Sequence, residues 1–266
     1  MRARSAKFVY LALALSLGWT ASAHAGEGVI EINQAAATAG GVIPGDAAGF
    51  PVTLANGGLG NEPTSYRLTG PLTLSGGDDG IEIIGDNITL DLNGFAIKCI
   101  LPGPSGQCTG HGVSSSTSAN VTVRNGSIEF MEDGVALTGA GARVEDVRAY
   151  KNHGNGIHLG ADCTVIDSSA NDNGINGIVV ASGCLVQGNT ANNNGQSTNN
   201  TAGDGIDTTV GCNVTGNTVR TNEGRGLNLS TATGYSNNVI QGNTTGTVLN
   251  GVSTGQNLCN GLTTCP

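Results

Sequence analysis

The chain reads NGIHLGADCTVIDSSANDNG over residues 155–174 and, after Ile175, repeats the pattern as NGIVVASGCLVQGNTANNNG over residues 176–195. In both units the tripeptide Asn-Gly-Ile opens a run in which apolar residues alternate with residues that would point outward, as in a short strand. A valine and then an alanine follow at equal offsets, so each unit predicts three short strands. Self-similarity of this kind is typical of a solenoid.

The opening tripeptide recurs along most of the chain. Its glycine is followed by Ile, Val or Leu at Gly80, Gly112, Gly134, Gly156, Gly177, Gly205, Gly226 and Gly251. We expect the second strands to carry Val121, Val144, Val165, Val186, Val214 and Val239, and the third strands to carry Ala149, Ala170, Ala191 and Val219. The period is about 22 residues, with loops inserted at 99–108 and 196–202. Helical repeats are disfavoured because no unit has a continuous helical period, and Asn and Gly oppose one.

Asparagines occupy two further columns. We expect one column to contain Asn125, Asn189, Asn217 and Asn243, and the other Asn152, Asn173, Asn194 and Asn222. Asparagine tolerates the left-handed backbone of sharp turns, and amides stacked at the spacing of neighbouring strands hydrogen-bond along a column. The sequence therefore predicts a right-handed parallel β-helix, an all-β solenoid of about seven or eight coils with three strands each.

The composition agrees with this fold. The 266 residues include 44 Gly, while aromatics make up 3% and charged residues 12%. Glycine without a strict three-residue period excludes collagen. The formal net charge of −9 argues against a nucleic-acid partner, because phosphates are bound by Lys and Arg.

Several segments carry a recognisable resemblance. Asp86-Asn87-Ile88-Thr89-Leu90-Asp91-Leu92-Asn93-Gly94, Asn120-Val121-Thr122-Val123-Arg124-Asn125-Gly126, and the repeated Val-x-Gly-Asn-Thr with Asn-Gly-Ile resemble the repeats of the pectate-lyase-like superfamily. The chain looks most like uncharacterised secreted bacterial members of that superfamily. The resemblance covers about residues 66–256 and implies a parallel β-helix that works on sugar polymers along one sheet.

The ends of the chain predict other roles. Residues 1–25 have a basic start, an apolar stretch and a final Ala-x-Ala, which is the layout of a signal peptide cleaved near Ala25. The apolar stretch is too short to span a membrane. We therefore expect a monomer exported to the periplasm or the outside, with a cap over residues 26–65, the β-helix over 66–256 and a tail over 257–266. Loss of Arg2, Arg4 and Lys7 makes the mature chain more acidic.

The cysteines divide into two groups. Cys99 with Cys108 and Cys259 with Cys265 bracket short segments, which predicts two local disulfides in an exported chain. Cys163, Cys184 and Cys212 fall at the same place in successive units, where small buried residues also occur, and are interpreted as free buried thiols. Three sulfurs in one line do not converge on a tetrahedron, so no metal site is expected.

Candidate site residues lie on and beside the first strands. The outward positions of these strands are Glu82, Ser114, Ala136, His158, Val179, Asp207 and Asn228. The residues that precede the repeat glycines are Asp79, His111, Asp133, Asn155, Asn176, Asp204, Arg225 and Asn250. A His between carboxylates suits acid or base catalysis. We therefore assign candidate catalytic roles to His111, Asp133, His158, Lys151 and Arg225, and substrate contacts to Asp79, Asn155, Asp204 and Asp207.

Two functional classes remain open. In the first, the protein interacts with a polysaccharide as a lyase, hydrolase or epimerase. In the second, it is a non-catalytic extracellular or cell-envelope β-helix, because Asp, Asn and His also suit tight turns. The run Gly76-Gly77-Asp78-Asp79-Gly80 matches part of a Ca²⁺-binding repeat and leaves Ca²⁺ open as a cofactor.

Overall fold

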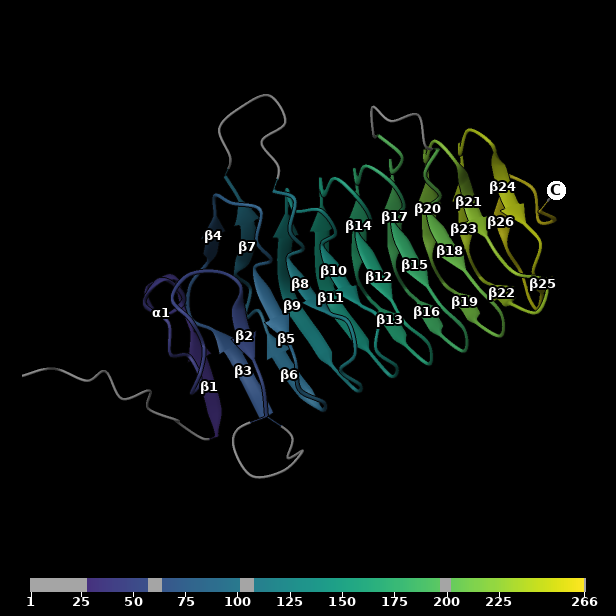
Figure 1. Ribbon diagram of the computed structural model, residues 1–266. Coiled ribbons are helices and arrows are strands. Elements are labelled where there is room, and N and C mark those ends of the chain that lie inside the picture. The colour runs from purple at the N-terminus through teal and green to yellow at the C-terminus, as the bar shows by residue number, and fades with distance from the viewer. Residues whose placement is uncertain (1–27, 57–63, 101–107, 197–201, 266) are drawn as a thin grey trace, which may run out of the picture.

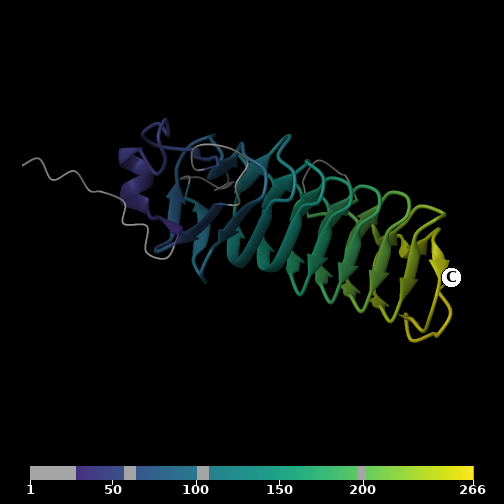
Figure 2. The same cartoon turned by 90° about the horizontal axis from the view of Figure 1, so that it is seen from below.

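The computed structural model describes residues 28–56, 64–100, 108–196 and 202–265, and in them the chain winds into a solenoid of parallel strands (Figure 1). Successive coils stack side by side from the N-terminal end to the C-terminal end, and the view from below shows the same stacking (Figure 2). The predicted signal peptide lies outside the described residues. No helix in the described part of the chain is long and apolar enough to cross a membrane.

The first strands of the coils form one parallel sheet of nine strands, which we call the first-strand sheet. Its members are β2 (Val52–Leu54), β5 (Ile81–Ile83), β8 (Val113–Ser115), β10 (Val135–Leu137), β12 (Ile157–Leu159), β15 (Ile178–Val180), β18 (Ile206–Thr208), β21 (Arg225–Asn228) and β24 (Gly246–Leu249). Seven of the eight predicted repeat glycines lie at the start of these strands, but Gly251 is wrong, because it precedes β25 of the other sheet and β24 opens at Gly246. Strand β2 lies in the segment that we assigned to the cap, and it has no repeat glycine of its own.

The second and third strands pair into one continuous sheet of seventeen strands. The second-strand row contains β1 (Val29–Ile32), β3 (Thr64–Leu68), β6 (Ile88–Asp91), β13 (Thr164–Ile166), β16 (Leu185–Gln187), β19 (Asn213–Thr215), β22 (Gly234–Ser236) and β25 (Val252–Ser253). The third-strand row contains β4 (Leu72–Leu74), β7 (Ala96–Cys99), β14 (Ser169–Asn171), β17 (Thr190–Asn192), β20 (Thr218–Arg220), β23 (Val239–Gln241) and β26 (Leu258–Cys259). Strands β9 (Thr122–Glu129) and β11 (Arg143–Tyr150) run through both rows and join them.

A short helix, α1 (Gln34–Ala39), covers the N-terminal end of the solenoid (Figure 1). The side chain of Asn33 accepts a hydrogen bond from the Ala36 N–H at 2.9 Å and so caps the first turn. Ala37 is fully buried on the inner side of the helix. Covering the end in this way shields a core that would otherwise be open to water.

Small aliphatic residues fill the interior in columns. Val144, Val165, Val186 and Val214 are in register on successive coils and all are fully buried. The predicted third column, Ala149 to Val219, is also in register. Two predicted members of the second column are wrong, since the paired residues at its ends are Val123 and Tyr235 instead of Val121 and Val239.

Two buried asparagine ladders run along the solenoid, as expected, but with different members. The Oδ1 of each asparagine accepts a hydrogen bond from the backbone N–H of the residue at the equivalent position in the preceding coil. The first ladder contains Asn189, Asn217, Asn238 and Asn257. The second contains Asn152, Asn173, Asn194, Asn222 and Asn243. Asn125 belongs to neither ladder, because its side chain bonds to Asp91.

The cysteines form three disulfides. The predicted pairs Cys99–Cys108 and Cys259–Cys265 are confirmed. The interpretation of the remaining cysteines as free thiols is wrong for two of them, because Cys163 and Cys184 are bonded across neighbouring coils with Cα atoms 4.5 Å apart. Cys212, one coil further, is free and buried, and burial raises the pKa of its thiol. Stacked parallel strands place equivalent residues close enough for such a bond.

Candidate functional site

The outward face of the first-strand sheet carries the predicted row of side chains. Glu82, Ser114, Ala136, His158, Val179, Asp207 and Asn228 are in register on consecutive strands. We call this set the outward row. The residues on either side of each member point into the core, for example Ile157 and Leu159 beside His158. Alternation along a three-residue strand therefore presents one outward side chain per coil.

The residues before the repeat glycines form a third ladder, which we call the turn column. Each side chain accepts the backbone N–H of the next member on the following coil. The members are Asp79, His111, Asp133, Asn155, Asn176, Asp204 and Arg225, the last only as a donor. Asn250 does not belong to it, because the following coil opens at Gly246 in β24, and Val252 lies in β25. One atom of each accepting side chain thus has a structural task.

The second carboxylate oxygen of Asp133 lies between two histidines. His111 Nδ1 is 3.9 Å from it and His158 Nδ1 is 3.6 Å from it. The Asp133 side chain is 9% exposed, whereas those of His111 and His158 are 35% and 39% exposed. We call these three residues the Asp133 group. A nearly buried carboxylate that faces two accessible imidazoles is an arrangement suited to proton transfer.

The two histidines play different parts in the Asp133 group. Nδ1 of His111 accepts the Asp133 backbone N–H at 3.2 Å, so the proton of the neutral ring is on Nε2. His158 is free of any such ladder bond and turns its Nδ1 toward the carboxylate. With a proton on that Nδ1, the Nε2 lone pair of His158 is available on the outer face. In that protonation state an imidazole can accept a proton at Nε2, which is the chemistry of a general base.

A second histidine and carboxylate pair lies beside the Asp133 group. His153 Nδ1 is 3.0 Å from Glu132 Oε2, and both side chains are well exposed. Sequence reasoning missed Glu132. The signal was present, since Glu132 directly precedes Asp133 and His153 follows one repeat later.

Asp204 and Asp207 form a separate acidic group on β18 and its turn. Burial raises the pKa of Asp204. The hydrogen bonds from the Arg225 N–H and the Asn228 side chain, and the charge of Arg225, lower it in part, so the net shift is upward. Burial, followed by repulsion from Asp204, raises the pKa of Asp207. The structure therefore brings Asp204, Asp207 and Arg225 together, with Asp207 two strands and Arg225 three strands away from His158.

This acidic group predicts a stability change with pH. A carboxyl whose pKa is raised on folding binds its proton more readily in the native state, so stability falls as the pH rises from the ordinary value of 3.8 through the raised pKa. We expect Asp207→Asn to be more stable than the wild type at neutral pH and equal to it in acid, as measured by urea unfolding across a pH series. A stability difference that stays constant with pH would contradict this.

Lys151 lies outside the Asp133 group. Its ammonium is 5.0 Å from the centroid of the ring of Tyr150, the C-terminal residue of β11. Its pKa is raised by its interaction with Tyr150 and, to a smaller extent, by the charge of Asp172. These contacts hold Lys151 on the third-strand side, so the structure gives no support for a role beside His158.

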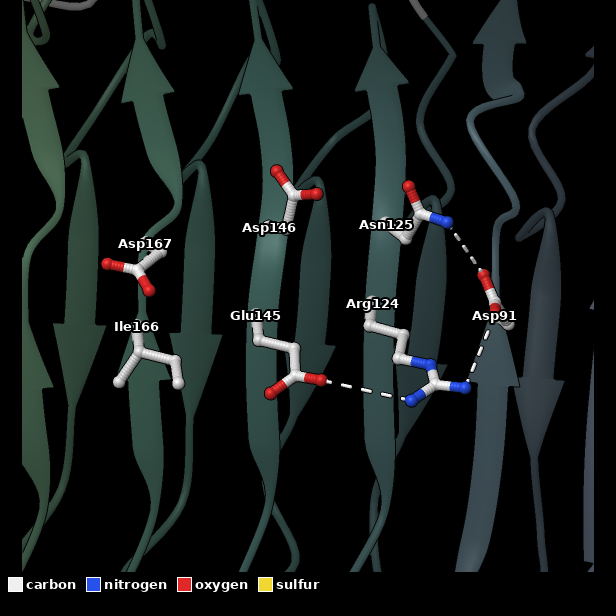
Figure 3. A pocket seen from close by; sticks show the side chains of 7 residues that line it. All are labelled: Asp91, Arg124, Asn125, Glu145, Asp146, Ile166 and Asp167. Atoms are coloured by element: carbon white, nitrogen blue, oxygen red, sulfur yellow. Dashed lines mark hydrogen bonds and ion pairs between the residues drawn. The ribbon is translucent and has the colours of Figure 1, made fainter.

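A shallow cavity of about 310 Å³ opens on the seventeen-stranded sheet (Figure 3). It is lined by Asp91, Arg124, Asn125, Glu145, Asp146, Ile166 and Asp167. Arg124 lies between Asp91 and Glu145, at 3.3 Å and 4.0 Å. None of the site residues predicted from the sequence lines this cavity. Within the described ranges, no group of three or more His, Cys, Asp or Glu side chains is arranged to hold a metal ion.

Comparison with known proteins identifies the fold family. Residues 71–209 match the family described as right handed beta helix region, and the chain belongs to this family. The predicted right-handed parallel β-helix is therefore confirmed. No curated protein matches the chain.

Two solved structures are similar in fold. The A-module of mannuronan C-5 epimerase AlgE4 from Azotobacter vinelandii has 14% sequence identity and a TM-score of 0.54. The similarity covers 74% of this chain and 62% of that module, so the chain spans less than two thirds of it. The AlgE6 A-module from the same organism has 17% identity and a TM-score of 0.34, over 77% of this chain and 83% of that one.

Proposed function

We propose that this protein is exported and binds a polysaccharide along the first-strand sheet, with His158 as a proton-transfer base oriented by Asp133. The observation that carries the proposal is the Asp133 group, in which a nearly buried carboxylate faces an imidazole on an outward strand position. Turn chemistry does not require a histidine at position 158. The likeness in fold to the module of an enzyme that acts on mannuronan supports a polysaccharide as the ligand.

The spacing of the strands determines how a polymer would meet this face. Neighbouring strands of a sheet lie about 4.8 Å apart, so a chain of sugar rings laid along the solenoid meets a new outward side chain on each coil. His111 and Asp79 lie on the coils before His158, and Asn155 shares its coil. We propose that they hold the polymer beside the base. A lyase, a hydrolase and an epimerase all need a base in such a place.

The second candidate is a non-catalytic, monomeric β-helix of the cell envelope or the extracellular space. It would bind a ligand without converting it, or serve as a rigid structural spacer. The turn column favours it, because Asp79, Asp133 and Asp204 each use one oxygen to hold the next coil. The aspartates of the turn column are then explained by their structural hydrogen bonds and need no catalytic role. For this candidate we expect no turnover of any glycan, whether or not the protein binds one.

Turnover distinguishes the two candidates. The protein is incubated with acidic and neutral polysaccharides, with and without Ca²⁺, while unsaturated products, reducing ends and sugar stereochemistry are followed. On an accepted substrate we expect His158→Gln to lower kcat by about 10²–10⁴-fold, the usual contribution of a general base. Asp133→Asn should lower it as well, because the ring loses its orienting charge.

The matched control is His153→Gln, which removes a histidine from the same coil outside the Asp133 group. It should leave kcat within about twofold of the wild type, on the scale of surface substitutions. Equal activity of His158→Gln and the wild type would reject His158 as the base. Binding without turnover on any polymer would favour the second candidate.

A further inference from the structure

We infer that the first-strand sheet selects a glycan without carboxylate or sulfate groups, an inference that rests on the proposed function. Its basis is the distribution of charge around the solenoid. Among the described residues, Arg225 is the one Lys or Arg on the first-strand sheet or its turn column. The others lie on the seventeen-stranded sheet or in the turn after β11, at Arg67, Lys98, Arg124, Arg143, Arg148, Lys151 and Arg220.

The same face, with its one cation, carries five of the described carboxylates. They are Asp79, Glu82, Asp133, Asp204 and Asp207. The guanidinium of Arg225 is near Asp204, whose charge it partly offsets. An acidic polymer laid along this face would bring its charges against carboxylates that have no excess of cations around them. Like charges that face each other across an interface suppress binding.

The remaining groups suit hydroxyls. Asp79 Oδ2 accepts the Ser114 hydroxyl at 2.5 Å, which shows the kind of bond that a sugar hydroxyl would make there. Glu82 is exposed, and Asp207 is half-buried beside Asn228 on the next strand. Carboxylate and amide oxygens accept hydrogen bonds from hydroxyls without needing a charge on the ligand.

Calcium could bridge an acidic polymer to an acidic face. The described residues of this face, however, do not gather three carboxylates in one place for a metal ion. The carboxylates are spread over several coils, with Asp133 three strands before Asp207. Of the three reaction classes, hydrolysis is the one that does not depend on an acidic proton next to a sugar carboxylate.

Binding measurements test this selection. The purified protein is run through native gels that contain xylan or mixed-linkage glucan as neutral polymers, or polygalacturonate or alginate as acidic ones, each with EDTA and with Ca²⁺. We expect retardation by a neutral polymer and at least tenfold weaker binding of both acidic ones, in either condition. Stronger binding of an acidic polymer would overturn the inference and leave the proposed function in place.

Charge variants separate the face from the rest of the molecule. We expect Glu82→Gln combined with Asp207→Asn to raise affinity for polygalacturonate by at least threefold. The matched control is Asp146→Asn, which removes an exposed carboxylate from the cavity on the seventeen-stranded sheet and should change nothing. An equal effect of the control would overturn the assignment to this face. Failure to bind any polymer would overturn the proposed function itself.

Discussion

Replacing Asn194 by alanine is expected to lower the free energy of unfolding by about 3–6 kcal/mol, because several buried polar groups lose their partners at about 1–3 kcal/mol each. The Asn194 side chain is fully buried. Its Oδ1 accepts from the Asn173 backbone N–H at 3.0 Å, and its Nδ2 donates to the Ala170 carbonyl at 3.0 Å and to Asn222 Oδ1 at 2.9 Å. Alanine can replace none of these bonds.

Urea unfolding followed by circular dichroism measures this loss. The matched control is Asn213→Ala, which removes the same side chain from an exposed position of β19. It should change stability by less than about 0.5 kcal/mol, as surface substitutions do. If both variants lose the same small amount, the ladder does not carry the stability that its geometry indicates.

Replacing Gly177 by alanine is expected to cost about 3 kcal/mol or more, the upper range for overfilling a packed interior. A Cβ atom on Gly177 would lie 2.6 Å from the Gly205 carbonyl oxygen, 2.7 Å from Asn194 Nδ2 and 3.1 Å from Ala191 Cβ. The first of these neighbours is backbone of the next coil, and the second is fixed in its ladder. Neither can move without disturbing a neighbouring strand.

The control for this substitution is Gly70→Ala. Its new Cβ would meet only Asn33 Cβ, at 4.0 Å, which is an ordinary contact. Thermal unfolding of the two variants should therefore separate clearly, with a lower Tm only for Gly177→Ala. A Tm of Gly177→Ala equal to that of the wild type would show that the coils can spread to admit a methyl group.

Seven of the eight repeat glycines predicted first strands correctly, because similar crowding leaves no room for a side chain at those positions. Gly251 did not, since the corresponding strand β24 opens at Gly246, where an added Cβ would meet nothing within 4 Å. The asparagine ladders were harder to read. Gly242-Asn243-Thr244 has the same letters as Gly216-Asn217-Thr218, yet Asn217 pairs with Asn238 and Asn243 pairs with Asn222. Both ladders place asparagine at a sharp turn, so local chemistry is the same in the two. Only the pairing of neighbouring coils separates them.

The candidate site was predictable in part for a similar reason. Sequence spacing placed Asp133 in the turn column and His158 in the outward row. Their contact, however, is diagonal, because it joins a turn residue of one coil to a strand residue of the next coil. The same diagonal joins Asp79 to Ser114 and Asp204 to Asn228. In each pair a turn residue meets the outward residue of the following coil. Lys151 contacts the ring of Tyr150, and repeat spacing does not predict a side-chain contact of this kind.

The turn column also determines how such a protein can change. Its members hold the coils together through backbone N–H groups, so their replacement carries a structural cost. Most members of the outward row have no such bond, and two of them, Ala136 and Val179, carry no polar group at all. New chemistry can therefore arise one coil at a time at those two positions, without removing a bond that holds neighbouring coils together.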